Sequence, residues 1–308
     1  MSDAQQVDLS TRVAGIDLAN PVLLASGTCG YGEELEPFLR LAEVGGIITK
    51  TITPEPRSGN RPPRIVETPS GMLNAIGLQN PGLEGFVEHK WPFLSTLETK
   101  VIVNIAAPTV EQHGEMTARI DALGGVAGIE VNISCPNIRE GGVLFGCNPR
   151  ASADVISTVR RHTKLPVIAK LTPNVTDITE TARSVVDAGA DAVSLINTLV
   201  GMAVDIEARR SILDNVTGGL SGPAIKPVAL AMLWKVRQAV DVPLLGLGGI
   251  SSTQDALEFL ITGASAIQVG TATFVKPGAA GDIVAGLGDY CRKVGIARLD
   301  DVVGSLKS

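Results

Sequence analysis

The sequence predicts an α/β fold of the (β/α)8 type, a TIM barrel, and three observations support this fold class. Short apolar runs alternate with longer amphipathic segments along most of the 308 residues, as strands alternate with helices in such barrels. The runs are almost continuous Val, Ile, Leu and Ala, which is typical of parallel strands covered on both faces. The alternation repeats eight times, whereas the alternative, a doubly wound open sheet, usually needs fewer units.

The elements follow in order along the chain. The expected strands are Val22–Ala25, Gly46–Thr49, Val101–Ile105, Ile129–Ile133, Val167–Lys170, Ala192–Ile196, Leu244–Leu247 and Ala266–Val269. Helical patterns lie between them at Glu33–Val44, Leu83–Thr96, Val110–Leu123, Ala151–His162, Thr179–Ala188, Ala224–Val240 and Thr253–Thr262. Gly-Gly or Gly-Ala pairs follow several of these helices, as expected where a helix is capped before the next strand. We find no internal repeat, low-complexity tract or linker, and we expect a single domain over residues 1–308.

Three segments interrupt the alternation. We expect Val7–Leu18 to form a hairpin that closes the bottom of the barrel. Thr53–Pro81 is rich in Pro and Gly and too long for a tight turn, and Leu199–Pro223 separates the sixth strand from the next long helix. Long loops at the C-terminal ends of barrel strands usually carry the function, so both insertions are candidates for the site.

Composition excludes several classes of protein. The net charge of −6 is spread along the chain, which argues against nucleic acid as a partner because phosphate binding needs a basic face. Four cysteines, Cys29, Cys135, Cys147 and Cys291, share no C-x-x-C spacing, which indicates a reducing compartment and no disulfide framework, zinc site or iron–sulfur site on this chain. The N-terminus lacks a signal pattern, and no apolar run reaches the roughly 18 residues that span a bilayer. We expect a soluble, cytoplasmic protein with no membrane partner.

Polar residues close several of the expected strands. Lys50 follows the second strand, Asn104 lies in the third, Asn132 ends the fourth, Lys170 closes the fifth, and Asn197-Thr198 end the sixth. Each has an ordinary explanation alone: a strand-terminal Asn often closes a turn, and Lys170 can pair with Glu130 on the adjacent strand. Together they predict a site at one mouth of the barrel, where the C-terminal strand ends meet.

Glycines follow the last two strands. Gly248-Gly249 and Gly270-Thr271 place backbone N–H groups where they can approach an anion, and barrels commonly bind phosphate at this position. The alternative is that these are plain turn glycines. The pattern is not G-x-G-x-x-G in a βαβ unit, so it predicts no nicotinamide dinucleotide fold on this chain.

The segment Asn74–Asn80 is rich in side-chain amides, which donate and accept hydrogen bonds at once. Together with Asn132, Asn137, Asn197 and the cation of Lys50, it predicts a cavity for a small planar ring that carries N–H, C=O and carboxylate groups. The alternative is that Asn74–Asn80 is only a turn loop, which would be the better interpretation if no other polar cluster accompanied it.

Cys135 follows the fourth strand in the motif Ser134-Cys135-Pro136-Asn137, and we expect the next segment, Ile138–Gly146, to be a lid. A solitary cysteine is more often an inert small hydrophobe. In polar surroundings its thiolate can remove a proton from a carbon acid. Because a free cysteine has a pKa of about 8.5, such a base predicts activity that rises with pH.

A set of motifs along essentially the whole chain is highly specific in combination: Ala25-Ser26-Gly27-Thr28, Lys50-Thr51, Asn74–Asn80, Asn104, Asn132–Asn137, Lys170, Asn197-Thr198, Ser221-Gly222-Pro223, Gly248-Gly249 and Gly270-Thr271. On these residues the chain resembles the dihydroorotate dehydrogenase family. Cysteine at the base position, Cys135, marks the soluble class 1 enzymes, and the loop Asn197–Asp205 resembles the NAD-linked subgroup, class 1B.

The resemblance implies roles for individual residues. Cys135 would be the base that removes the C5 proton of dihydroorotate while a hydride leaves C6 for N5 of FMN. The implied substrate-binding residues are Lys50, Asn74, Ala75, Ile76, Gly77, Leu78, Asn132, Asn197 and Thr198. The implied FMN-binding residues are Ser26, Lys50, Thr51, Asn104, Asn132, Lys170, Ile196, Gly222, Gly248, Gly249, Gly270 and Thr271. Cys147 departs from the family pattern, where Thr is expected, and receives no role.

The resemblance also implies partners. This chain would bind FMN and pass electrons from dihydroorotate to a second subunit that holds FAD and a 2Fe–2S cluster, with NAD as the final acceptor and orotate as the product. A homodimer of this chain within a heterotetramer is expected. Two alternatives stay open: a class 1A homodimer that reduces fumarate, against which the Leu199–Asp205 loop argues, and a non-catalytic flavin-barrel subunit that only positions another chain.

Overall fold

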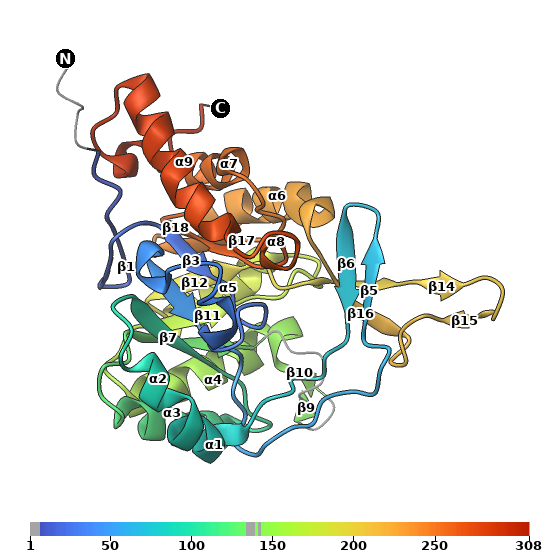
Figure 1. Cartoon of the computed structure of the whole chain (residues 1–308). Helices are drawn as coiled ribbons and strands as arrows, with labels where there is room; N and C mark the ends of the chain where they lie inside the picture. The colour runs from blue at the N-terminus through green and yellow to red at the C-terminus, as the bar shows by residue number, and fades with distance from the viewer. Residues whose placement is uncertain (1–6, 134–138, 141–142, 308) are drawn as a thin grey trace.

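The computed structural model describes residues 7–133, 139–140 and 143–307. In this part of the chain, eight parallel strands close into a barrel (Figure 1). In spatial order they are β3 (Val22–Leu24), β4 (Gly46–Ile48), β7 (Lys100–Ile105), β8 (Gly128–Asn132), β11 (Val167–Lys170), β12 (Ala192–Leu195), β17 (Leu244–Leu247) and β18 (Ala266–Val269). Every predicted barrel strand is found at its expected place, so the predicted (β/α)8 fold is confirmed.

Helices surround the barrel and pack on it through one large apolar core. They are α1 (Gly82–His89), α2 (Trp91–Leu94), α3 (Val110–Asp121), α4 (Pro149–His162), α5 (Ile178–Asp187), α6 (Lys226–Arg237), α7 (Thr253–Thr262), α8 (Ala272–Val275) and α9 (Ala279–Val294), with the 3-10 turns η1 (Glu33–Leu35), η2 (Leu41–Glu43), η3 (Phe145–Cys147), η4 (Pro223–Ile225) and η5 (Leu299–Val302). Side-chain oxygens of Thr109, Asn148, Asp177 and Ser252 accept first-turn N–H groups and so fix where α3, α4, α5 and α7 begin.

Two helix predictions were wrong in detail. The expected helix Glu33–Val44 is replaced by η1 and η2, because Pro37 has no N–H to donate and Arg40 is extended, with φ −70° and ψ 112°. The expected helix Leu83–Thr96 is divided into α1 and α2 around Lys90, next to Pro92. The remaining predicted helices correspond to α3–α7.

The N-terminal hairpin closes the bottom of the barrel, as predicted. Its strands β1 (Thr11–Val13) and β2 (Ile16–Leu18) are joined at Ala14 and Gly15, both with positive φ, as a two-residue hairpin turn requires. Val13, Ile16 and Leu18 form a separate apolar cluster with inward-facing residues of the barrel strands, namely Leu23, Ile48, Ile102, Ile168, Ala192, Leu245 and Ala266. The apolar plug leaves the opposite mouth for polar residues.

The two long insertions pair with each other to form one antiparallel sheet, which the sequence analysis did not predict. β5 (Ile65–Thr68) and β6 (Gly71–Asn74) come from the first insertion, and β13 (Leu199–Met202) and β16 (Thr217–Ser221) from the second, in the order β13-β16-β6-β5. This sheet stands beside the barrel, and β14 (Val204–Asp205) with β15 (Arg210–Ser211) extends beyond it as an arm (Figure 1). Leu73, Ala75 and Leu213 form a small core of its own.

The segment predicted as a lid, Ile138–Gly146, lies partly outside the described residues. Within it, the backbones of β9 (Arg139–Glu140) and β10 (Val143–Leu144) pair antiparallel.

Candidate active site

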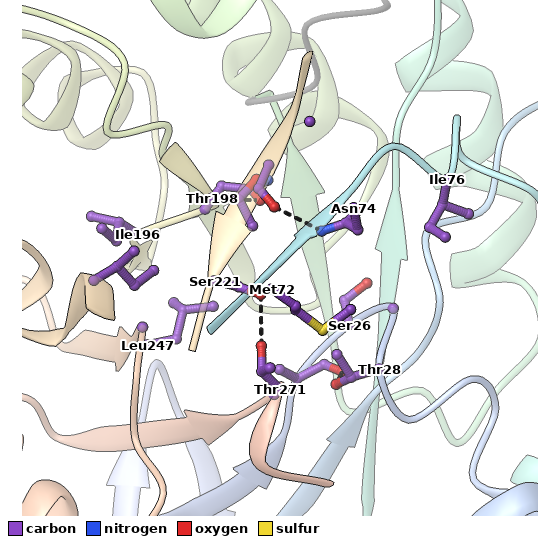
Figure 2. A pocket seen from close by; sticks show the side chains of 18 of the residues that line it. Ser26, Thr28, Met72, Asn74, Ile76, Ile196, Thr198, Ser221, Leu247 and Thr271 are labelled. Carbon is purple, nitrogen blue, oxygen red and sulfur yellow. Dashed lines mark hydrogen bonds between the residues drawn. The ribbon is translucent and has the colours of Figure 1, made fainter. Parts of the chain in front are cut away.

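A cavity of about 810 Å³ opens where the C-terminal ends of the barrel strands meet the small sheet. Its volume is within the roughly 300–1,000 Å³ typical of ligand and cofactor pockets. Figure 2 shows Met72 of β6 beside Ser221 of β16 and Asn74 of β6 near Thr198, with Thr271 hydrogen-bonded to Ser221 from the end of β18. The walls thus combine strand ends with both insertions, as a site at this face of a barrel requires.

Most of the predicted site residues line this cavity. They are Ser26, Lys50, Thr51, Asn74, Ala75, Ile76, Gly77, Leu78, Asn132, Lys170, Ile196, Asn197, Thr198, Gly222, Gly248, Gly249, Gly270 and Thr271. Asn104 is an exception, because it is fully buried beneath the cavity and does not line it. Cys135, together with Ser134, Pro136 and Asn137, lies outside the described residues, while Ile133 just before them lines the cavity.

A line of polar side chains crosses four strand ends. Ser26 Oγ lies 3.5 Å from Thr51 Oγ1, and Thr51 Oγ1 accepts from Asn132 Nδ2 over 3.3 Å. Asn197 Nδ2 then donates to Asn132 Oδ1 over 3.5 Å, and Asn197 Oδ1 accepts from the backbone N–H of Thr198 over 2.8 Å. Each side chain orients the next, so the set offers both donors and acceptors in fixed directions.

Two lysines contribute positive charge to the cavity wall. Lys50 is held at its backbone, where its N–H donates to the carbonyl of Gly30 over 2.8 Å. Lys170 is only 5% exposed, and its Nζ lies 3.7 Å from Glu130 Oε1. Within the described part of the chain, this ion pair is the only polar contact of Lys170 Nζ. The ammonium group therefore keeps N–H donors available for a ligand in the cavity that Lys170 lines.

Glu130 of β8 occupies the centre of the barrel, directly beneath the cavity. It is fully buried and accepts from Asn104 Nδ2 over 2.6 Å, Ser194 Oγ over 2.8 Å and Gln268 Nε2 over 2.8 Å. The pair between Lys170 and Glu130, which the sequence analysis gives as the ordinary explanation of Lys170, is therefore present. It belongs to a larger network of polar side chains around Glu130. This network also explains why Asn104 is buried beneath the cavity. In the pairing of β7 with β8, Asn104 stands opposite Glu130.

The glycines after the last strands present unpaired backbone donors. The N–H groups of Gly249, Gly270 and Thr271 form no hydrogen bond with any described residue, and all three residues line the cavity. Gly248 and Gly249 have φ values of +125° and +78°, which favour glycine, and a Cβ on Gly249 would lie 2.8 Å from the carbonyl oxygen of Gly222. This corner of the cavity therefore has the donor set that binds an anion.

The loop that starts at Asn74 is fastened on both sides. Asn74 Nδ2 donates to the carbonyl of Gly219 in β16 over 3.3 Å, and Asn60 Nδ2 donates to the carbonyl of Ala75 over 2.9 Å. Arg64 Nη2 donates to Gln79 Oε1 over 2.5 Å. These bonds fix Asn74, Ala75 and Gln79 at the cavity wall.

Sequence reasoning missed several residues of the cavity wall. Thr172 and Asn174 follow Lys170 directly after β11, which is the same strand-end signal that identified the other polar residues. Gln268 is a polar residue inside an apolar strand, a pattern that it shares with Glu130. Arg64 carried no comparable signal, because it lies in an insertion whose strands were not predicted.

Of the three cysteines in the described part of the chain, Cys147 lines the cavity, whereas Cys29 and Cys291 do not. Cys29 and Cys291 are buried, and burial raises the pKa of the Cys29 thiol to about 12. Cys147 is exposed at the cavity wall, with Sγ 3.8 Å from the carbonyl of Asn174.

Among the residues that the structure describes, no group of three or more His, Cys, Asp or Glu side chains is placed to hold a metal ion. Over the same ranges, no helix has the length and apolar character needed to cross a membrane.

Comparisons with known proteins agree with this geometry. The family model described as dihydroorotate dehydrogenase matches residues 8–290. A protein of Geotalea daltonii named dihydroorotate dehydrogenase B (NAD(+)), catalytic subunit, is 57% identical over 300 residues, which are 97% of this chain and 98% of that protein. Proteins of the same name from Geobacter sulfurreducens and Desulforudis audaxviator are 55% and 52% identical, over 98% and 97% of this chain and 99% and 98% of their own lengths. The chain belongs to the dihydroorotate dehydrogenase family.

Proposed function

We propose that this chain is the catalytic subunit of an NAD-linked dihydroorotate dehydrogenase, which oxidises dihydroorotate to orotate in pyrimidine biosynthesis. The observation that carries the proposal is the chain of amide and hydroxyl groups through Thr51, Asn132 and Asn197, in one cavity with Lys50 and Lys170. Relatives that match nearly the whole chain carry this enzyme's name.

The substrate suits the donors and acceptors of the wall. Dihydroorotate has ring N–H and C=O groups, and asparagine side chains can both donate to and accept from such groups. Its carboxylate suits the cation of Lys50. We assign substrate binding to Lys50, Asn74, Ala75, Ile76, Gly77, Leu78, Asn132, Asn197 and Thr198, all of which line the cavity.

Three features of the chain fit FMN as its cofactor. Lys170 presents buried donors that suit the electron-rich edge of an isoalloxazine ring. The side-chain oxygens of Asn104 and Gln268 are buried and have no hydrogen-bond partner among the described residues, so they suit ring N–H groups. The unpaired backbone N–H groups of Gly249 and Gly270 suit a phosphate.

When bound, FMN supplies the hydride acceptor. Its proposed contacts are Ser26, Lys50, Thr51, Asn104, Asn132, Lys170, Ile196, Gly222, Gly248, Gly249, Gly270 and Thr271. Asn104 differs from the others in acting from beneath the cavity, through its buried carbonyl oxygen.

Cys135 is the proposed base for the C5 proton. This role rests on the family resemblance, and its support in the fold is the position of Ile133 and Asn132, which bring the end of β8 to the cavity. A thiolate in the cavity would remove the proton while the substrate's hydride leaves from C6.

The electrons then need a partner. We propose a second subunit with FAD and a 2Fe–2S cluster, NAD as final acceptor, and a homodimer of this chain within a heterotetramer. The term "catalytic subunit" in the relatives' names supports a separate partner. A cytoplasmic location is proposed from the scattered cysteines, which suit a reducing compartment.

The test uses the purified chain with FMN, mixed with dihydroorotate in the absence of oxygen. Loss of the yellow flavin absorbance is expected with dihydroorotate alone, and NAD should reoxidise the flavin only after the partner is supplied. Reoxidation by fumarate without a partner would instead indicate the class 1A enzyme. A flavin that dihydroorotate never reduces would contradict the catalytic function.

The matched variants are Cys135→Ala and Cys291→Ala, the latter removing a buried thiol of α9 that does not line the cavity. Cys135→Ala should retain FMN and slow flavin reduction by roughly 100-fold or more, the contribution usual for a general base. Cys291→Ala should reduce its flavin at close to the original rate. Loss of FMN from Cys135→Ala, without a specific defect in reduction, would favour the non-catalytic alternative.

A further inference from the structure

Glu130 is the most enclosed charged residue among those described, since its side chain has no exposed surface. It lies in the middle of the barrel and contacts residues from four other strands. Asn104, Ser194 and Gln268 donate to its carboxylate at 2.6–2.8 Å, and Lys170 Nζ lies 3.7 Å away. Because a carboxylate only accepts, each of these neighbours must turn a donor toward Glu130.

This requirement fixes the direction of two amide groups. Asn104 and Gln268 point their NH2 groups at Glu130, so their carbonyl oxygens must point elsewhere. Both oxygens are buried without a partner in the described part of the chain, and Gln268 is one of the residues that line the cavity. A buried acceptor without a partner is rare unless something binds there.

Lys170 is held by the same residue. Its side chain is 6% exposed, and Glu130 is the only carboxylate paired with it among the described residues. The ammonium lies 3.7 Å from Glu130 Oε1, and Lys170 is one of the residues that line the cavity, whereas Glu130 is not. A ligand next to Lys170 therefore experiences the combined effect of the positive charge of Lys170 and the negative charge of Glu130. Both charges act in a buried region, where screening by water is weak.

We propose that Glu130 is a positioning residue that sets the reduction potential of the bound flavin. It holds the Lys170 ammonium at the cavity floor, offsets part of its charge, and turns the carbonyl oxygens of Asn104 and Gln268 toward the ring. The inference rests on the proposed FMN site. A carboxylate behind the lysine disfavours the extra negative charge of reduced FMN, so Glu130 keeps the potential lower than Lys170 alone would.

The test compares Glu130→Gln with Ser194→Ala in the FMN-loaded chain. Glu130→Gln keeps the volume and Oε1 while removing the charge, and Gln268 can rotate to accept from the new NH2 group. That rotation turns an N–H donor toward the ring, which also favours the reduced form. Ser194→Ala removes one hydrogen bond to Glu130 without changing the charge, and Ser194 does not line the cavity.

The readout is the midpoint potential of bound FMN, measured against a redox dye without oxygen. In Glu130→Gln we expect the ratio of reduced to oxidised FMN at a fixed potential to rise about tenfold, which is about +30 mV for a two-electron couple. Ser194→Ala should stay within about threefold of the original ratio. An unchanged or lowered potential in an FMN-loaded Glu130→Gln protein would overturn the inference.

A second comparison applies if Glu130→Gln does not fold or does not hold FMN. Removing one partner of a buried ion pair leaves the other charge uncompensated, whereas removing both relieves it. Glu130→Gln combined with Lys170→Met should therefore recover a cooperative thermal unfolding transition that Glu130→Gln lacks. A double variant as unstable as the single one would show that Glu130 does not act through Lys170.

Failure of this inference is distinct from failure of the proposed function. If the original chain holds no FMN, or dihydroorotate does not reduce it, the proposed function is wrong and the inference falls with it. If the original chain passes both tests and Glu130→Gln matches Ser194→Ala, only the role of Glu130 is refuted.

Discussion

The side-chain amide of Asn174 donates to the backbone carbonyl of Thr198 over 3.0 Å. Its Oδ1 accepts from the backbone N–H of Val200, also over 3.0 Å. These two bonds fasten the start of β13 and the residue before it to the loop after β11. Thr198 and Val200 both line the cavity, so Asn174 holds the wall on which the proposed substrate residues Asn197 and Thr198 stand.

Replacing Asn174 by Ala should therefore weaken substrate binding more than it slows the chemistry. Each lost hydrogen bond contributes about 1 kcal/mol, so we expect KM for dihydroorotate to rise roughly 5–30-fold while kcat changes by less than about threefold. Steady-state rates with a soluble dye as electron acceptor measure both parameters. Asn174→Asp keeps the acceptor for Val200 and should show a smaller rise. An unchanged KM with a reduced kcat would contradict a role in holding this wall.

The corner formed by Gly249 predicts a second effect, on FMN retention. A methyl group there would lie 2.8 Å from both the Gly222 carbonyl oxygen and Lys226 Cβ, at a φ of +78°. Gly249→Ala should raise the dissociation constant of FMN at least about tenfold, since left-handed strain alone costs about 1–2 kcal/mol and the contacts force the loop to move.

Gly124→Ala is the matched control, because Gly124 has a φ of +70° but no atom within 4 Å of an added Cβ. It should lower thermal stability slightly and leave FMN binding as it was. Fluorescence titration of the apoprotein with FMN measures both variants, and equal dissociation constants would refute the importance of this corner.

The barrel was predictable because its strands are covered on both faces and so carry unbroken apolar runs. The small sheet was not, because its pairing joins residues far apart: Asn74 contacts Gly219, 145 positions away, and no local pattern encodes that partner. α9 was missed because Gly281, Gly286 and Gly288 lower its helix propensity, while its buried stripe of Ala280, Ile283, Leu287 and Cys291 stabilises it by packing.

The residues of the candidate site also fall into those that the sequence could predict and those that it could not. Polar residues at strand ends were found, because their position after an apolar run is visible in sequence. Asn104 was assigned to the cavity wall, although its place opposite Glu130 puts it one layer below. The role of Cys135 and the single-domain organisation stay predictions.

The cluster behind Gly249 predicts a third effect, on stability. Lys226 Nζ lies 2.6 Å from Asp255 Oδ1 and 2.8 Å from Glu258 Oε2, while Asp255 Oδ2 accepts from the backbone N–H of Ser251 over 2.9 Å. Burial raises the pKa of Asp255, but hydrogen bonds from Lys226, Ser251 and Ser252 outweigh it, so the pKa is lowered overall. Such a carboxylate stabilises the fold above the unfolded-state pKa of about 3.9, and the contribution is lost as pH falls through the folded-state pKa.

Lys226→Met should reduce the free energy of unfolding at neutral pH by about 2 kcal/mol, because it leaves two carboxylates of a partly buried cluster without their cation. Lys276→Met is the control. Its pair with Asp282 is exposed, with side chains 68% and 59% accessible, and exposed pairs contribute about 0–1 kcal/mol. Urea titration of both variants gives the comparison, and equal losses would show that burial of the Lys226 cluster does not matter.

His113 predicts a dependence of stability on pH. Its Nε2 accepts from the backbone N–H of Ala107 over 3.1 Å, so Nδ1 carries the proton and donates to the carbonyl of Thr109 over 2.7 Å. Burial lowers the pKa of His113 to about 4. An unfolded histidine binds its proton near pH 6.5, so between about pH 6.5 and pH 4 the unfolded chain binds more protons than the folded one, and stability falls as pH falls.

The expected loss from this one residue is about 3 kcal/mol over that interval, since each unit of pKa difference corresponds to about 1.4 kcal/mol. In His113→Gln the side chain no longer titrates, so its unfolding free energy, although lower at pH 7, should change less between pH 7 and pH 4.5. His89→Gln, which replaces a histidine whose side chain is 65% exposed, is the matched control for loss of an imidazole outside the core. If the unfolding free energy of the original chain and of His113→Gln fell equally steeply between pH 7 and pH 4.5, protonation of His113 would not be the cause of the acid sensitivity. A buried neutral imidazole that resists protonation must make the original chain lose more stability over this interval than the variant does.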